Sequence, residues 1–266
     1  MAAGKSMGRR WLVWAGAAVL AAGVGWSPAA RAQATGKSPE RVTSMLPGMK
    51  APDMGHQRFA HVLLDQLEGR TNGSGEEFRW DGEGWMGGDM NRLWLKSEGF
   101  VRNGVMTDGD QEALYDHPIP RLRYFDAQAG VREDLDSYPR RTWAAIGIEG
   151  MAPFYFDFEP TFYIRGGGHV AGRIQGSYDL LLTQRLILQP QAELNFYSKD
   201  DRARRIGSGL SEVDTGLRLR YEFSRKLAPY IGMAYTGEYG DTARYARMDH
   251  ESTGETQFVF GLRTWY

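Results

Sequence analysis

The stretch Thr256-Gln-Phe-Val-Phe-Gly-Leu-Arg-Thr-Trp-Tyr266 alternates between apolar and polar side chains. One face of an extended strand would carry Phe258, Phe260, Leu262 and Tyr266. The opposite face would carry Gln257, Gly261 and Arg263, with Val259 as the exception. A strand that is apolar on one face, polar on the other and ends in an aromatic residue is typical of the closing strand of a transmembrane β-barrel. A soluble β-sandwich shows the same alternation, so the rest of the chain decides between them.

The same two-residue period recurs through the second half of the chain, where clusters of Gly, Asp, Asn and Pro interrupt it. It predicts strands over residues 154–165, 170–182, 186–196, 213–223, 229–238 and 256–266. The first half is less regular and predicts strands over 59–68, 76–86, 92–102, 110–116, 121–132 and 142–151. The total of about twelve is even, as in bacterial single-chain barrels. Most of these strands approach the ~9–11 residues that cross a bilayer, but 110–116 is short.

The polar faces of the strands in the second half are rich in charge. They carry Asp157, Glu159, Arg165, Arg173, Asp179, Glu193, Arg218, Arg220, Glu222 and Arg263. A barrel would direct these side chains into a polar lumen, where acids and bases pair. A soluble sandwich would leave them in water and pack the apolar faces together. We predict an all-β fold, a transmembrane antiparallel up-and-down β-barrel of about 12 strands, with long polar loops over 199–205 and 239–254.

The first 34 residues have the organisation of an export signal. A basic start (Lys5, Arg9 and Arg10) precedes an apolar run over 11–25 and the small-x-small sites Ala30-Arg-Ala32 and Ala32-Gln-Ala34. The apolar run is shorter than the ~20 residues that a spanning helix needs. We therefore predict a signal peptide over 1–34, a short flexible arm over 35–57 and the barrel over 58–266. An uncleaved N-terminal anchor is the alternative.

Cysteine is absent, which excludes disulfides and thiolate metal sites. The net charge of the whole chain is −1. Removal of the signal takes away four basic residues and no acid, so the remainder is mildly acidic. Nucleic-acid binding requires a basic patch, and the sequence therefore predicts no nucleic-acid partner.

The arm contains residues that bind copper in other contexts, namely Met45, Met49, Met54 and His56. Thioether sulfur is a soft ligand that suits Cu⁺, and imidazole suits both Cu⁺ and Cu²⁺. Spaced methionines in a flexible segment can wrap one ion without a preformed cavity. The alternative is that these residues are incidental, because Met is a common filler. The barrel adds four candidate metal ligands, His61, Asp89, Met90 and His117, although a lone histidine is more often a surface or lumen residue.

Several stretches, in order along the chain, resemble one known family. They are Val62-Leu-Leu-Asp-Gln-Leu-Glu68, Trp80-Asp81 with Trp85-Met-Gly-Gly-Asp89, Asn91-Arg-Leu-Trp-Leu-Lys-Ser-Glu-Gly99 and Tyr124-Phe-Asp-Ala-Gln-Ala-Gly-Val-Arg132. Through them the chain resembles the copper resistance protein B family of outer-membrane proteins, over about residues 56–266. The resemblance implies an outer-membrane barrel that binds copper (Cu⁺ or Cu²⁺) and protects the periplasm from excess copper. Family members usually have a longer Met- and His-rich arm. This chain also has Tyr115-Asp-His117 where many relatives have Tyr-Ser-Arg.

The leading hypothesis is an outer-membrane copper-binding protein of a copper resistance system that captures, sequesters or exports excess periplasmic copper. The arm would collect ions, and lumen carboxylates would attract them: Asp65, Glu68, Asp81, Asp89, Glu98 and Asp126. About twelve strands predict a narrow, occluded route rather than a free pore. The expected partners are copper ions, outer-membrane lipid and a periplasmic copper oxidase or copper carrier.

Two other functions compete with copper binding. One is a structural or general-diffusion barrel without a metal role. The other is an outer-membrane lipid hydrolase, which needs a serine and a histidine in contact. Ser177 and His169 are close in sequence, but no nucleophile motif surrounds Ser177. We expect the chain not to be an enzyme.

Overall fold

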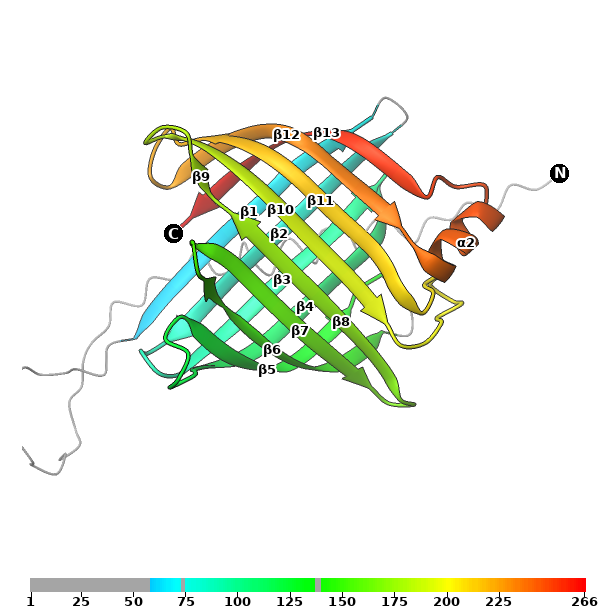
Figure 1. Ribbon diagram of the computed structural model, residues 1–266, viewed down its shortest axis with the longest axis horizontal. Helices are drawn as coiled ribbons and strands as arrows, with labels where there is room; N and C mark the ends of the chain where they lie inside the picture. The colour runs from blue at the N-terminus through cyan, green and yellow to red at the C-terminus, as the bar shows by residue number, and fades with distance from the viewer. Residues whose placement is uncertain (1–57, 73–74, 137–139) are drawn as a thin grey trace, which may run out of the picture.

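The computed structural model describes residues 58–72, 75–136 and 140–266, and their strands form one closed antiparallel barrel (Figure 1). The strands are β1 (Phe59–Thr71), β2 (Glu76–Gly87), β3 (Arg92–Arg102), β4 (Val105–Pro118), β5 (Phe125–Asp134), β6 (Arg141–Ala152), β7 (Phe156–Arg165), β8 (His169–Tyr178), β9 (Leu180–Leu181), β10 (Leu186–Tyr197), β11 (Gly209–Tyr221), β12 (Leu227–Glu238) and β13 (Gly254–Trp265). The two residues of β9 follow β8 directly and pair with the same neighbour, β10. The wall therefore has twelve strands, as the sequence predicts.

Closure of the barrel depends on the pairing of β1 with β13. Leu63 pairs with Trp265, and the backbone N–H groups of Val62 and Tyr266 each donate to the carbonyl of the other residue at 2.9 and 2.8 Å. β1 thus begins and β13 ends at the same end of the barrel, here called the terminal end (Figure 1). The opposite end, here called the helix end, carries α2 (Gly240–Met248). The predicted signal peptide and arm lie outside the described residues.

The strands direct apolar side chains outward and polar ones inward. Phe162, Ile231, Met233 and Phe260 are each more than half exposed on the outer face. Within the lumen, Glu68, Arg70, Arg79 and Arg218 are buried although all four are charged. This arrangement is the inverse of a soluble protein, and it confirms the predicted inward direction of Arg173, Glu193, Arg218 and Arg220. Among the described residues, no helix is long and apolar enough to cross a membrane.

Three predicted boundaries are wrong for identifiable reasons. The strand predicted over 110–116 extends over Val105–Pro118, because its backbone pairs with β3 through a bulge beside Phe100 whatever the polarity of its side chains. The strand predicted from residue 121 begins at Phe125, because Leu122 donates to the carbonyl of Ile119 in a turn. The loop predicted over 239–254 contains α2, whose buried residues include Tyr245.

A further predicted strand begins later than expected. The sequence alternation starts at Phe154, whereas β7 begins at Phe156. Phe154 and Tyr155 have φ angles of +70° and +62°, which an extended strand does not allow. These two aromatic residues form the turn between β6 and β7.

Aromatic rings cover glycines of neighbouring strands at several points of the wall. The ring of Trp80 lies over Gly99, its cross-strand partner, and a Cβ added there would lie 2.5 Å from the ring and 2.9 Å from the carbonyl oxygen of Asp108. In the lumen, Tyr230 covers Gly261 and donates its hydroxyl to Glu68 at 3.1 Å. Aromatic–glycine pairs of this kind pin the register of adjacent strands.

We expect Gly99→Val to lower the free energy of unfolding by about 1–3 kcal/mol, because the added methyl groups force Trp80 away from the wall. The measurement is urea-induced unfolding in detergent micelles. Gly75→Val is the matched control, since no atom lies within 4 Å of a Cβ added at Gly75. Equal stability of the two variants would contradict the packing role of Gly99.

Candidate functional site

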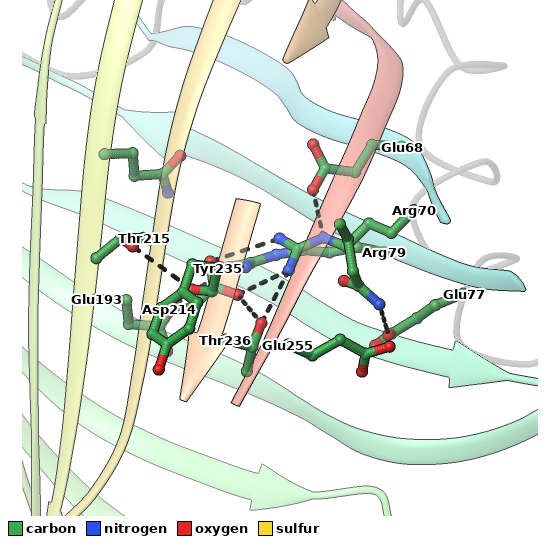
Figure 2. A network of polar contacts seen from close by, with 12 residues as sticks. Glu68, Arg70, Glu77, Arg79, Glu193, Asp214, Thr215, Tyr235, Thr236 and Glu255 are labelled. Atoms are coloured by element: carbon green, nitrogen blue, oxygen red, sulfur yellow. Dashed lines mark hydrogen bonds and ion pairs between the residues drawn. The ribbon is translucent and has the colours of Figure 1, made fainter. Parts of the chain in front are cut away.

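Buried ion pairs fill the lumen toward the helix end (Figure 2). Arg70 contacts Glu68 and Asp214, each at 2.7 Å, and Arg218 donates its Nε to Glu68 at 2.9 Å. Thr236 donates its hydroxyl to Asp214 at 2.8 Å. Desolvation of these charges is costly, and the partners offset that cost only when their hydrogen bonds are satisfied. Glu68 meets this condition, because two arginines and the Tyr230 hydroxyl bind its carboxylate.

Part of this network crosses the lumen from wall to wall. Arg79 of β2 contacts Glu193 of β10 at 3.1 Å, and these two strands are five positions apart around the sheet. Glu193 in turn lies 3.5 Å from Nε of Arg173 on β8, which contacts Asp110 of β4 at 2.7 Å. We call the chain Arg79–Glu193–Arg173–Asp110 the crossbar. It spans the lumen with paired side chains from four strands.

A cavity of about 410 Å³ lies on the terminal side of the crossbar. We call it the acidic chamber, because ten carboxylates line it: Asp65, Asp81, Glu83, Glu98, Asp110, Glu112, Glu149, Asp157, Glu159 and Asp179. Of the residues that the structure describes, three cationic side chains line it, Lys96, Arg173 and Arg263. Arg173 and Asp110 belong to both features, so the crossbar forms one boundary of the chamber. This excess of negative charge would attract cations.

Two chamber carboxylates are available to a ligand. Within the part of the chain that the structure describes, neither Asp81 nor Glu83 has a hydrogen-bond or ion-pair partner. Other chamber acids are paired: Arg263 contacts Asp65 at 2.7 Å, and Lys96 contacts Glu149 and Glu159. Asp81 and Glu83 therefore lack a direct cationic partner, and among the described residues Asp157 also forms no ion pair.

The helix end is covered by the segment between β10 and β11. Its Arg204 contacts Asp108, Asp134 and Asp136 at 3.2, 3.3 and 2.6 Å. Burial raises the pKa of the Asp136 carboxyl, an effect that the Arg204 guanidinium opposes. The backbone N–H of Gly207 in the same segment donates to the Thr242 hydroxyl of α2 at 2.8 Å. These contacts join β4 and β5 to α2 across the end of the barrel.

The predicted metal ligands of the barrel lie at its terminal end, in β1, in the turn between β2 and β3 and in β4. His61 lies between two indole rings, with centroids 6.2 Å from Trp85 and 5.6 Å from Trp265. Nδ1 of His117 lies 3.2 Å from Oδ1 of Asn91, in the turn that also holds Asp89 and Met90. Among the residues that the structure describes, no three His, Asp or Glu side chains converge as a metal site would require.

Two further predictions about these residues can be compared with the structure. Asp89 is exposed in the turn between β2 and β3, so the prediction that it is a lumen carboxylate is wrong. Asp65, Asp81 and Glu98 line the chamber as predicted, whereas Glu68 lies in the ion-pair network and Asp126 contacts Arg92 at 3.1 Å. The arm residues Met45, Met49, Met54 and His56 lie outside the described residues.

The serine–histidine pair considered for a hydrolase is not brought together. His169 begins β8 at the helix end and Ser177 lies in the same strand near the terminal end. Eight residues of extended chain separate them by about 26 Å. This pair therefore offers no nucleophile–base contact.

Sequence reasoning missed several chamber residues, namely Glu83, Lys96, Glu112 and Glu149. A usable signal was present, since Glu83 follows Asp81 and Lys96 precedes Glu98 by two positions, which places each pair on one face of a strand. Which strands face each other across the lumen is not visible in that pattern.

We expect Arg79→Met to lower the free energy of unfolding by about 3–5 kcal/mol, because it leaves Glu193 and Asp214 buried with one partner fewer. The comparison is Arg102→Met, since Arg102 is about half exposed and its ion pairs are worth less than about 1 kcal/mol. Unfolding in micelles measures both variants. A similar loss of unfolding free energy in Arg79→Met and Arg102→Met would show that the crossbar stabilises the barrel no more than an exposed ion pair does.

Comparison with known proteins identifies the family. Residues 58–266 match the family described as Copper resistance protein B precursor (CopB). The chain is 44% identical to Copper resistance protein B of Escherichia coli over 205 residues, which are 77% of this chain and 69% of that protein. It is also 44% identical to the Copper resistance protein B homolog of Pseudomonas syringae pv. tomato over 207 residues, 78% of this chain and 70% of that protein.

A solved structure described as the NanC porin shares the fold. It covers 77% of this chain and 99% of its own, with a TM-score of 0.50 and 15% sequence identity. The likeness concerns the barrel alone. The sequence matches go further, and on them the chain belongs to the copper resistance protein B family.

Proposed function

We propose that this protein lies in the outer membrane and captures excess periplasmic copper in the acidic chamber. Membership of the family supports a role in copper resistance. The single observation that carries the finer proposal is the chamber itself, in which ten carboxylates face three cationic side chains. A low-dielectric wall around one sign of charge concentrates counter-ions inside it.

The outer face of the barrel supports the membrane location. Its exposed apolar side chains would need a hydrocarbon surrounding. Barrels of this class have short periplasmic turns and longer outer loops. The longest connections here, 198–208 and 239–253, lie at the helix end. We therefore assign the terminal end, and with it the chamber, to the periplasmic side.

The ligand types in the chamber favour one oxidation state of copper. Its free acids are hard oxygen donors, which suit Cu²⁺ better than Cu⁺. The predicted arm residues Met45, Met49 and Met54 have the softer donors that suit Cu⁺. A periplasmic copper oxidase or copper carrier would be the partner, because oxidation of Cu⁺ yields the ion that the chamber prefers.

The crossbar supports capture rather than free diffusion. Paired side chains from β2, β10, β8 and β4 meet across the lumen between the chamber and the helix end. A general-diffusion barrel requires an open lumen at this level. The competing hypothesis, a structural or diffusion barrel without a metal role, predicts no copper binding.

We expect Asp81→Asn with Glu83→Gln to weaken Cu²⁺ binding about tenfold or more, because two uncompensated charges are lost from the chamber. Both substitutions keep the side-chain size, and neither residue holds a structural ion pair. Calorimetric titration of the full-length protein in micelles with Cu²⁺ and Cu⁺ separately gives the affinities. Glu133→Gln is the control, since the side chain of Glu133 is 40% exposed and, among the described residues, pairs with exposed Arg140.

The arm is tested in the same titration by changing Met45, Met49, Met54 and His56 to Ala. Loss of Cu⁺ binding with retention of Cu²⁺ binding would agree with the assignment of the two ions. Absence of copper binding in every protein would leave a structural or diffusion barrel.

We expect Phe260→Arg to make folding into a bilayer less favourable by about 2–4 kcal/mol, the cost of a cation on the lipid-facing surface near the midplane. Phe260 lies in the middle of β13 and its side chain is 54% exposed on the outer face. Tyr124→Arg is the control, because Tyr124 is 71% exposed in a turn at the terminal end. Folding into lipid vesicles measures both, and equal effects would argue against a membrane location of the β13 face.

A further inference from the structure

Lys96 is the only lysine among the chamber-lining residues, and its ammonium is bound by carboxylates of two other strands. Nζ of Lys96 lies 2.6 Å from Glu159 of β7 and 3.0 Å from Glu149 of β6. The side chain is 14% exposed and passes the indole ring of Trp94, with Nζ 5.3 Å from its centroid. A positive charge thus already occupies the point at which these carboxylates meet.

A third carboxylate lies beside the same ammonium. Glu83 pairs with Lys96 in the β2–β3 register, which places the two side chains on the same face of the sheet. Unlike Glu149 and Glu159, Glu83 makes no hydrogen bond or ion pair with any described residue. Three oxygen-bearing side chains from β2, β6 and β7 therefore surround the end of Lys96, and one of them is free.

The other two cations of the chamber are committed elsewhere. Arg173 belongs to the crossbar through Asp110 and Glu193. Arg263 contacts Asp65 of β1 at 2.7 Å. It also lies 4.0 Å from Asp179, the residue that follows β8. Neither of them has a contact with Glu83, Glu149 or Glu159. Among the described residues, Lys96 is the cation in direct contact with two of these three acids, Glu149 and Glu159.

We propose that Lys96 is a tethered counter-ion that occupies the divalent-cation position of the chamber and sets how tightly the chamber holds its cargo. The inference rests on the proposed function, in which the chamber receives copper. An arriving divalent ion first meets the free carboxylates of Asp81 and Glu83, and then displaces the ammonium from Glu149 and Glu159. Because the flexible stem keeps the ammonium nearby, it can return and expel the ion.

This role accounts for the lack of a converging metal site among the described residues. Glu149 and Glu159 point their oxygens at the ammonium, with the short distances typical of charge-assisted hydrogen bonds. Competition by a built-in cation keeps binding reversible, which suits a protein that passes cargo on. A site without Lys96 would bind a divalent ion more tightly and release it more slowly.

The test is Lys96→Met, which keeps an unbranched side chain one atom shorter and removes its charge. Mn²⁺ is the probe, because it prefers carboxylate oxygen to thioether or imidazole and so ignores the arm. Electron paramagnetic resonance of free Mn²⁺ measures its binding to the full-length protein in micelles. We expect Lys96→Met to bind Mn²⁺ about tenfold more tightly than the unmodified protein, and Lys96→Arg to bind as weakly as the unmodified protein.

Two further variants separate occupancy from overall charge. Arg263→Met removes the same charge from another wall of the chamber and should change the affinity less than about threefold. Addition of Glu149→Gln and Glu159→Gln to Lys96→Met should abolish the gain. If Lys96→Met fails to fold, Lys96→Gln replaces it, because glutamine also removes the charge but still donates hydrogen bonds to the carboxylates.

The outcomes are distinct from those of the copper titration. An unchanged Mn²⁺ affinity in folded Lys96→Met or Lys96→Gln would overturn the proposal, as would an equal gain in Arg263→Met. Copper binding by the unmodified protein with no effect of Lys96 would keep the proposed function and sink this inference. A gain in Mn²⁺ affinity in Lys96→Met, with no copper binding by the unmodified protein, would support the role of Lys96 and contradict the proposed function.

Discussion

The architecture depends on the pairing of charges inside a closed barrel. A wall of twelve strands leaves a lumen that must be filled, and this chain fills much of it with arginines and carboxylates rather than with apolar side chains. Each buried ion needs partners from more than one strand, as Arg70 shows with Glu68 on its own strand and Asp214 on β11. The pairs therefore connect walls that the backbone hydrogen bonds do not.

The division of the lumen follows from where the charges balance. Toward the helix end, arginines pair with most of the acids in the network and the crossbar, and Arg204 contacts Asp108, Asp134 and Asp136. Toward the terminal end, acids outnumber cations and a cavity remains. The balanced region provides rigidity, and the unbalanced region provides the field on which the proposed capture of copper depends.

Much of the wall was predictable from the sequence, because a strand with one apolar and one polar face shows alternating apolar and polar residues. The final strand shows this most clearly: Phe258 and Phe260 lie outside, Gln257 is buried inside, and Val259, the exception to the pattern, is buried in the lumen. Prediction failed where backbone geometry rather than polarity decides. Phe154 and Tyr155 continue the alternation but adopt positive φ angles in a turn, and α2 lies in a segment without an apolar period of useful length.

The candidate site was predicted only in part. Asp65, Asp81 and Glu98 were expected in the lumen and line the chamber, but Glu83, Lys96 and Glu149 were not singled out. By itself, the sequence determined the all-β class, a count of about twelve strands and the inward face of charged side chains in the second half of the chain, because these depend on residues one or two positions apart. Only the tertiary structure decided which charges meet, since the contacts of Lys96 with Glu149 and Glu159 join β3 to β6 and β7 across the lumen. Such contacts depend on the curvature and closure of the sheet, which no local pattern encodes.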